Sequence, residues 1–451
     1  MGTHAVVIGA SMAGLSAARV LADRFGSVTV LDRDDLPADA VPRRGVPQGR
    51  HGHVLLVSGL RALTELFPGL PDELIAAGAT RMDTGADMVV YRFGRRWRNA
   101  PTGLVLISQS RPQLEAIVRA RVMALPRVTI KACAAVSALT GDQSKITGVR
   151  LDDGETLTAD LVVDASGRGS RSDRWLSALD LPVPEQVEIK IGIAYSTRLY
   201  KRVPGEWPGF RGALVLPDPR SEQMAGMVLP IEGDRWLVAL GGWHLDHIPD
   251  DADAFEQGLR DLPDPAMADV VAKAEPVTDP MTHRFPSSRR RLFERLPANP
   301  AGYAAIGDSI CSFNPIYGQG MACAAMEALK LGVRLDEHRS ATAEMAAAYY
   351  RDAAEVISVP WQFGAGGDFA YAKTVGPKPR GVGFTNWYAR NLAIASQSDP
   401  DLNRTFSRVQ QLVDPPAHLF KPKAVVRTLW TAISAPSRRP SPARGAPCRG
   451  G

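Results

Sequence analysis

Residues 4–34 read HAVVIGASMAGLSAARVLADRFGSVTVLDRD, and this stretch decides the fold. The apolar run at 5–8 is short and continuous, which is typical of a strand buried on both faces of a parallel sheet. A turn of small residues at 9–14 leads into an apolar helical stripe, and a second apolar run at 28–31 ends in Asp32. Strand, turn, helix and strand in this order predict the first unit of a doubly wound α/β domain.

The turn at 9–14, Gly-Ala-Ser-Met-Ala-Gly, follows the glycine pattern of dinucleotide-binding turns with one departure. Gly9 permits the tight turn and Gly14 permits close packing of the helix on the strand, while Ser11 stands where the pattern has its middle glycine. Asp32 is placed to accept both hydroxyls of an adenosine ribose, and its charge would repel a 2′-phosphate. These residues predict a bound dinucleotide but do not separate NAD from FAD.

The middle of the chain predicts a meander followed by another buried strand. Segments at 128–139, 145–151 and 155–163 have strand composition and are separated by turn residues, so we expect an antiparallel meander. The last segment ends in Asp164, and the small-residue sequence Asp-Ala-Ser-Gly begins there. A meander that returns to a strand beside the first one is typical of FAD-binding variants of this fold.

A third turn-rich stretch lies at 305–320, AIGDSICSFNPIYGQG, and a helical run begins at Met321. With the turns at 9–14 and 164–167, it resembles the motif set of the single-component FAD monooxygenases of the para-hydroxybenzoate hydroxylase fold. The resemblance covers about residues 1–340. In the segments PRRGVPQGRHGHVLL, VVDASGRGSRS, GIAYSTRLY and CSFNPIYGQGM it is closest to actinobacterial epoxidases of polyether and polyene biosynthesis and to squalene-epoxidase-like enzymes.

The physical chemistry of the third stretch agrees with a flavin. Asp308 is placed to hold ribityl hydroxyls, and Gly318 and Gly320 let main-chain N–H groups approach the pyrimidine edge of the ring. The helix that follows would point its positive end at N1 and O2, where reduced flavin carries negative charge.

The resemblance and the residue types together predict the fold class and a set of cofactor contacts. We expect an α/β (α+β composite) chain with a Rossmann-like FAD-binding domain containing the meander, a β-sheet substrate domain and C-terminal helices. The expected FAD contacts are Gly9, Ser11, Met12, Ala13, Gly14, Asp32, Arg33, Arg43, Arg50, Arg111, Asp164, Gly307, Asp308, Pro315, Gly318, Gly320 and Met321.

Basic residues supply the remaining cofactor candidates. The segment 41–56, VPRRGVPQGRHGHVLL, is a basic loop running into a helix, and Arg43 or Arg50 is expected to reach the FAD phosphates or the flavin edge. Arg111 begins a helix and resembles the arginine with which the family braces the dinucleotide. His51 and His53 are expected to be structural rather than catalytic.

The substrate half is expected to be a sheet over the flavin domain. Alternating strands at 86–104 and 186–245 would form it, and its inner face would make the substrate wall. The candidate pocket residues are Tyr195, Trp236, Trp243 and Phe313. Residues 341–435 look helical, with a glycine-rich interruption at 361–381. The expected division is an FAD-binding domain at 1–85, 105–185 and 289–340, a substrate domain at 86–104 and 186–288, a helical region at 341–435 and a disordered tail at 436–451.

Composition narrows the function classes. The chain has 451 residues, 45% of them hydrophobic, and a net charge of +5, but four arginines lie within 437–450 and the remainder is near neutral. A nucleic-acid partner is therefore not expected. Four cysteines without CxxC spacing suggest neither disulfides nor a metal site, and we expect a cytoplasmic protein without signal peptide or membrane span.

The resemblance implies an FAD-dependent monooxygenase that passes one oxygen atom from O₂, through a flavin C4a-hydroperoxide, to a hydrophobic natural-product substrate. We expect alkene epoxidation, because an alkene needs no deprotonation and the sequence offers no base for a phenol. Aromatic hydroxylation and a geranylgeranyl-reductase-like activity stay open as alternatives. No second dinucleotide fingerprint is present, so electrons would come from NAD(P)H directly or from a partner flavin reductase.

Overall fold

The computed structural model describes residues 2–434, and it places the N-terminal stretch in a five-stranded parallel sheet of order β17-β11-β1-β2-β7. Its strands are β1 Gly2–Ile8, β2 Phe25–Leu31, β7 Val128–Lys131, β11 Leu161–Asp164 and β17 Tyr303–Ala305. The three expected turns follow β1, β11 and β17, which are neighbours in this sheet. Because parallel strands end at one edge, the turns meet at a single crevice.

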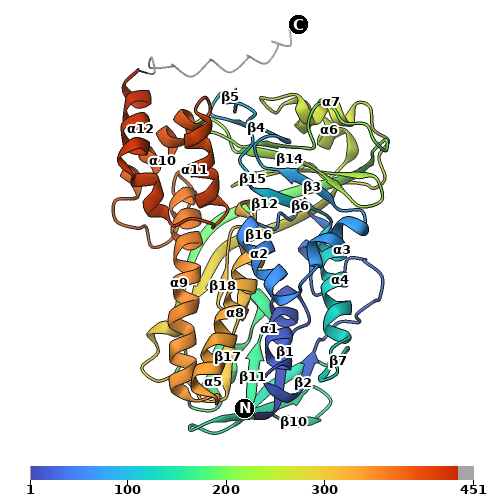
Figure 1. Cartoon of the computed structure of the whole chain (residues 1–451), viewed down its shortest axis with the longest axis vertical. Helices are drawn as coiled ribbons and strands as arrows, with labels where there is room; N and C mark the ends of the chain where they lie inside the picture. The colour runs from blue at the N-terminus through green and yellow to red at the C-terminus, as the bar shows by residue number, and fades with distance from the viewer. Residues whose placement is uncertain (1, 435–451) are drawn as a thin grey trace, which may run out of the picture.

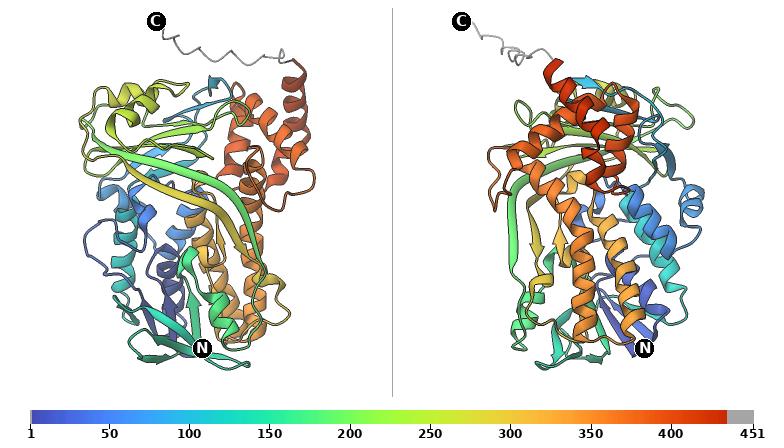
Figure 2. Two further views of the ribbon diagram at one scale, coloured as in Figure 1. Left: turned by 180° about the vertical axis from the view of Figure 1, so that it is seen from behind. Right: turned by 60° about the vertical axis from the view of Figure 1, so that its left-hand side comes forward.

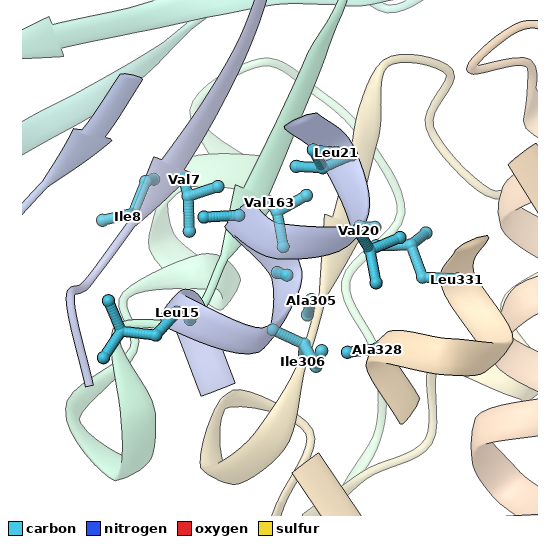
Figure 3. Close-up of a cluster of buried hydrophobic side chains, with 14 of the residues drawn as sticks. Val7, Ile8, Leu15, Val20, Leu21, Val163, Ala305, Ile306, Ala328 and Leu331 are labelled. Atoms are coloured by element: carbon cyan, nitrogen blue, oxygen red, sulfur yellow. The ribbon is translucent and has the colours of Figure 1, made fainter. Parts of the chain in front are cut away.

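Helices bury one face of this sheet. Figure 3 shows α1 (Met12–Ala22) between the sheet and α8 (Gly320–His338), with Leu15, Val20 and Leu21 among side chains of both. The apolar stripe expected after the first turn is therefore the buried face of α1. Each such side chain stabilises the fold by about 1.5–3 kcal/mol relative to its exposed state. The parallel sheet, α1 and α8 consequently form one rigid support for the turns.

The expected meander is present, but two of its segments are divided. Residues 128–139 form β7 in the parallel sheet and β8 (Val136–Gly141) in a three-stranded antiparallel sheet with β9 (Ile146–Leu151) and β10 (Thr156–Thr158). The chain changes direction at Cys133, which has a positive φ of 54°. Residues 155–163 are likewise divided between β10 and β11. Apolar alternation alone does not show where a strand leaves one sheet for another.

A second, eight-stranded sheet lies above the first and has the order β18-β16-β12-β15-β14-β13-β4-β5 (Figure 1). Its strands are β4 Met88–Arg92, β5 Arg95–Arg96, β12 Gln186–Lys201, β13 Gly212–Val215, β14 Met224–Ile231, β15 Arg235–Trp243, β16 Met281–Arg291 and β18 Cys311–Ser312. The pair β13–β4 is parallel and the other pairs are antiparallel. The long strands β12 and β16, green and yellow in Figure 2, run down beside the lower part of the molecule.

Most of the C-terminal region is helical, as expected, and the interruption lies within the expected range but is shorter. The helix α9 runs without a break from Ala343 to Asp368 and includes Pro360 and most of the first glycine cluster. Only 369–381 separates it from α10 (Val382–Ser396), after which α11 (Pro400–Gln410) and α12 (Pro422–Ser434) follow. Tertiary contacts therefore override the low helix propensity of glycine at 364–367.

The remaining elements connect or cover these layers. They are α2 Val57–Leu66, α3 Leu70–Ala76, β3 Thr80–Asp83, β6 Val105–Ser108, α4 Arg111–Met123, α5 Ser172–Ser177, α6 Ala252–Arg260 and α7 Ala266–Val271. No helix within residues 2–434 is long and apolar enough to cross a bilayer. The tail expected at 436–451 lies outside the described residues. The domain limits given above stay a proposal.

Candidate active site

A cavity of about 1470 Å³ opens between the two sheets and the C-terminal helices. Turn residues from all three expected motifs line its lower half, including Gly9, Gly167 and Gly318. Strands of the upper sheet and residues of α9, α10 and α11 line the rest. The cavity thus joins the crevice of the parallel sheet to a chamber above it.

The first turn brings bare backbone to this cavity. Gly9 has a φ of +107°, and a Cβ there would lie 2.5 Å from the carbonyl oxygen of Ala165 in the neighbouring turn. The helix α1 begins at Met12, and the Ser11 side chain does not cap it. The first N–H groups of α1 therefore present partial positive charge to the cavity. Ser11, Met12 and Ala13 line the cavity with Gly9.

Gly14, which we expected among the cofactor contacts, has a different position. It does not line the cavity. A Cβ at Gly14 would overlap the carbonyl oxygen of Gly9, so this glycine lets the first turn of α1 pack on the loop. Gly307 likewise lies outside the lining, with φ +64° and a Cβ position 2.8 Å from the Cβ of Ala13. Both glycines shape the crevice without facing it.

A buried charge network stands beside the first turn. Arg43 donates from Nε to Glu115 (2.6 Å) and from Nη1 to Asp34 (2.9 Å) and Asp32 (3.2 Å). Asp32 also accepts the N–H of Ala10 at 2.7 Å. The positive charge of Arg43 is thus balanced by three carboxylates of the protein. Contact of Arg43 with a phosphate stays a prediction, and only its Nη2 has no partner among the described residues.

Arg111 in this network has a guanidinium nitrogen that is both buried and unpaired. Its Nη2 donates to Ser11 Oγ and pairs with Glu115 Oε2, both at 2.8 Å. Its Nη1 is buried and has no hydrogen-bond partner among the described residues. Burial opposes ionisation of Glu115, but Arg111 and Arg43 outweigh it and hold the pKa of Glu115 below its usual range. A cation with an unused donor beside the start of α1 fits a pyrophosphate.

The third turn supplies a second free group. Asp308 lines the cavity, and its carboxylate has no hydrogen bond from the described residues. Burial raises the pKa of Asp308 to about 6, although Arg168 and Arg111 lower it in part. Gly320 opens α8, and Gly318 has φ +67°; both line the cavity with Pro315 and Met321. A half-buried acceptor beside the first N–H groups of α8 suits the hydroxyls and carbonyl of a ribityl-bearing ring.

Three further expected residues, besides Gly14 and Gly307, lie outside the lining of this cavity. Asp164 is fully buried outside the lining, and its carboxylate accepts hydrogen bonds from Ser166, Ser170, Tyr303 and Ser309. It therefore holds the second turn, and its contact with the cofactor stays a prediction that these bonds do not favour. Arg50 is exposed and does not line the cavity, whereas the exposed Arg33 does. Trp236, a pocket candidate, does not line the cavity either, because its side chain packs on Trp207 and Arg202 in the upper core.

The other pocket candidates do face the chamber, and two histidines join them. Tyr195, Trp243 and Phe313 line it with His51 and His283. The ring centroids of His51 and Tyr195 are 4.6 Å apart, and those of Tyr195 and His283 are 5.4 Å apart. His51 Nδ1 lies 2.9 Å from Thr197 Oγ1. Burial, with a smaller effect of His283, lowers the pKa of His51 to about 3; burial also lowers the pKa of His283.

A buried carboxylate at the end of α9 ties the chamber to the flavin turn. Asp368 Oδ1 accepts from Trp243 Nε1 (2.8 Å), Asn314 Nδ2 (2.8 Å) and Tyr317 OH (3.2 Å). Trp243 also stacks on Tyr371 with 4.4 Å between ring centroids. Burial raises the pKa of Asp368 to about 6, against the effect of its three donors. One carboxylate oxygen at the end of α9 therefore holds one side chain from β15 and two from the third turn.

Sequence reasoning missed several of these residues. Glu115 lies one helical turn after Arg111, and this i,i+4 spacing could have indicated the pair. Glu327 accepts the N–H of Gly307 at 2.7 Å from about two turns inside α8, where burial raises its pKa to about 8. Arg168 donates to Ser287 and Ser312, so it joins the second turn to the upper sheet. No local pattern marks Asp368.

The crevice and its free groups define a class of protein. A parallel sheet with three backbone turns, a free arginine nitrogen and a free carboxylate in one cavity is the arrangement of an FAD-binding enzyme whose flavin lies between two layers. Residues 2–361 match the family described as "FAD binding domain", and the chain belongs to that family.

Individual relatives agree with this assignment. Protein Rv3254 of Mycobacterium tuberculosis is 33% identical over 431 residues, which are 91% of this chain and 90% of that protein. Pseudomonas aeruginosa PqsL, in complex with 2-aminobenzoylacetate, has a TM-score of 0.60 at 19% identity and covers 91% of this chain and 99% of its own. Tetrameric 2-methyl-3-hydroxypyridine-5-carboxylic acid oxygenase has a TM-score of 0.62 at 18% identity, covering 91% and 97%. Both solved structures share the fold.

Replacing Asp308 tests its place in the cofactor site. Asp308→Ala is expected to weaken FAD binding about ten- to a hundredfold, because a hydrogen bond to a charged group contributes roughly 1.5–3 kcal/mol. Titration of apoprotein with FAD, followed by flavin fluorescence, measures this loss. Asp153→Ala, which removes an exposed carboxylate on the meander, is the matched control. Wild-type affinity in Asp308→Ala would show that this carboxylate does not contact the cofactor.

Proposed function

We propose that this enzyme hydroxylates an electron-rich aromatic ring held in the upper chamber. The observation that carries the proposal is the cluster of Tyr195, His51 and His283, whose rings converge on the cavity. A phenol-type substrate needs a proton acceptor near its hydroxyl, because the phenolate is the better nucleophile towards electrophilic oxygen. The expectation of epoxidation rested on the lack of such a base in the sequence, and this cluster supplies candidates.

His283 is the better candidate for the proton acceptor. It has no hydrogen bond to the described residues and is more accessible than His51, which is 3% exposed and held at Nδ1 by Thr197. A pKa of about 3 makes His51 neutral at pH 7 and a weak base, suited to orient the substrate. Tyr195 stands opposite His283 in the β12–β16 ladder and can relay a hydrogen bond.

The overall reaction that we propose is balanced. Substrate, O₂, NAD(P)H and a proton give hydroxylated substrate, NAD(P)⁺ and water; the electrons enter from NAD(P)H directly or through a partner flavin reductase. FAD, when bound, activates O₂ and transfers one oxygen atom. The residues of this chain position the ring, accept its hydroxyl proton and exclude water. The ligand in the PqsL complex, 2-aminobenzoylacetate, and the pyridine carboxylic acid in the name of the oxygenase are both aromatic, which supports this class.

Epoxidation of an apolar alkene is the second candidate. The chamber wall contains Phe93, Trp97, Phe363 and Phe406, and these side chains suit a hydrocarbon body that carries no hydroxyl. Incubation of holoenzyme with NADPH and either phenols or styrene separates the two reactions. Mass spectrometry would show the gain of one oxygen atom, and the product's structure would show where it was added. Oxygen uptake that never depends on added substrate would contradict both proposals.

Replacement of His283 tests the proposed base. His283→Gln is expected to lower phenol hydroxylation about a hundredfold, because general-base catalysis contributes at least that much. Epoxidation of styrene, which needs no base, should change less than about twofold. Rates at saturating substrate from pH 6 to 10 measure the effect, and the loss should shrink as the phenol ionises by itself. The exposed His338→Gln is the control, and an equal loss for both substrates would contradict a role as base.

A further inference from the structure

The chamber contains an arginine without a partner. Arg92 ends β4 and lines the cavity. Its Nε is buried without a hydrogen bond, and its guanidinium makes no ion pair or hydrogen bond with any other described residue. The other lining arginines that are not exposed have partners: Arg43 and Arg111 pair with Glu115, Arg390 pairs with Asp218 at 2.8 Å, and Arg168 donates to Ser287 and Ser312.

The surroundings of Arg92 do not compensate its charge. Its Cζ lies 4.7 Å from the ring centroid of Phe93, and the Cζ of Arg390 lies 4.8 Å from the same ring. Burial lowers the pKa of Arg92, while Tyr317, Tyr371 and Asp218 oppose that effect. An arginine nevertheless stays protonated in proteins. A charged group in a largely apolar chamber is costly unless an anion meets it.

The upper half of the cavity has an excess of positive charge. Arg98, Arg220 and Arg380 also line it, are exposed and form no ion pair with the described residues. Asp218 is the one acidic lining residue on this side, and Arg390 already pairs with it. The other acidic lining residues, which are Asp32, Asp152 and Asp308, belong to the flavin-binding segments. The chamber therefore favours an anion that enters with the substrate.

We propose that Arg92 binds a carboxylate on the substrate, so that the enzyme acts on an aromatic acid rather than on a neutral hydrocarbon. This inference rests on the proposed monooxygenase function and names its substrate class. A guanidinium takes a carboxylate in a bidentate geometry, which fixes orientation as well as position. The aromatic body would lie among Phe93, Trp243 and Tyr371, with its reactive end towards the flavin turn.

A binding measurement on holoprotein tests this inference without turnover. The probes are 2-naphthoate and 2-naphthamide, which share a ring but differ in charge, and the readout is the change in visible flavin absorbance. Wild-type protein is expected to bind the carboxylate at least about tenfold more tightly than the amide. Arg92→Gln should lose this preference, and Arg92→Lys should keep part of it. Arg96→Gln is the matched control, because Arg96 lies on the next strand, outside the cavity, and pairs with Asp264.

Two results would overturn the inference. One is equal affinity of wild-type protein for the two probes, or an unchanged preference in Arg92→Gln. The other concerns the nicotinamide nucleotide, whose phosphates are the alternative anions. If Arg92→Gln slows flavin reduction by NADPH without probe but binds naphthoate like wild type, Arg92 serves the nucleotide. A carboxylate preference in protein that never oxygenates a substrate would contradict the proposed function and leave the binding site in place.

Discussion

Gly320→Val is expected to give folded protein that is purified without FAD. A Cβ at this position would lie 3.5 Å from Asp308 Oδ1, an ordinary contact, and Gly320 does not have a positive φ. The fold therefore tolerates a side chain here. The methyl groups beyond Cβ would enter the cavity that Gly320 lines, at the start of α8. They would occupy the space of the ring and keep it from the first N–H groups of the helix.

The expected loss of FAD affinity is about a thousandfold or more, which corresponds to roughly 4 kcal/mol. Fluorescence titration of apoprotein measures the affinity, and circular dichroism with thermal unfolding shows that the variant is folded. Gly320→Ala should bind FAD with a much smaller loss, because its single Cβ fits. Lys330→Val places a β-branched residue at an exposed position of the same helix and is the control for helix propensity. Tight FAD binding by Gly320→Val would mean that the ring does not approach this turn.

Arg111→Met should lose FAD affinity by a factor of about thirty to several thousand. Removing one member of a buried, hydrogen-bonded charge pair costs roughly 2–5 kcal/mol, and Arg111 would contribute its free Nη1 to the pyrophosphate. The substitution also removes the ion pair between Arg111 and Glu115, so that Arg43 is the close cationic partner that Glu115 keeps. Arg121→Met, on the same helix, removes a surface pair with Glu73 and is the matched control.

If Arg111→Met does not fold, the double variant Arg111→Met/Glu115→Gln removes the unpaired carboxylate and keeps the test available. Equilibrium dialysis against FAD gives the affinity of either form. Binding as tight as wild type in a folded variant lacking Arg111 would show that the pyrophosphate lies elsewhere along α1.

The parts of the fold that follow from local chemistry were predictable. The turn at 9–14 could be recognised because a positive φ at Gly9 and the close approach at Gly14 both demand glycine, and both effects act within a few residues. The start of α8 at Gly320 was predicted within one residue for a similar reason, because apolar periodicity begins there.

Several candidate residues that lie outside the cavity have surroundings set by distant partners. Asp164 looked like a cofactor contact because it ends a strand beside the crevice, but four hydroxyl-bearing side chains and a backbone N–H occupy its carboxylate. The sequence does not show which face of β15 points to the cavity. The side chain of Trp236 lies on the face that packs in the upper core, away from the cavity. The surroundings of Asp368, at the end of α9, and of Arg92, at the end of β4, are formed by segments far apart in the sequence, so no local pattern predicts them.

The bonds to Asp368 also bear on how such enzymes can be recombined. The proposed boundary at 341 would suggest that the whole region after it can be exchanged between related enzymes. Such an exchange would be a way to change the lining of the chamber. Yet α9 ends on a carboxylate that receives Trp243, Asn314 and Tyr317, and Tyr371 stacks on the same tryptophan. A crossover at 341 would separate that acid from its donors. A junction after Tyr371 would keep that acid, its three donors and the stacked tyrosine in one parent chain, and it would leave α10–α12 to vary.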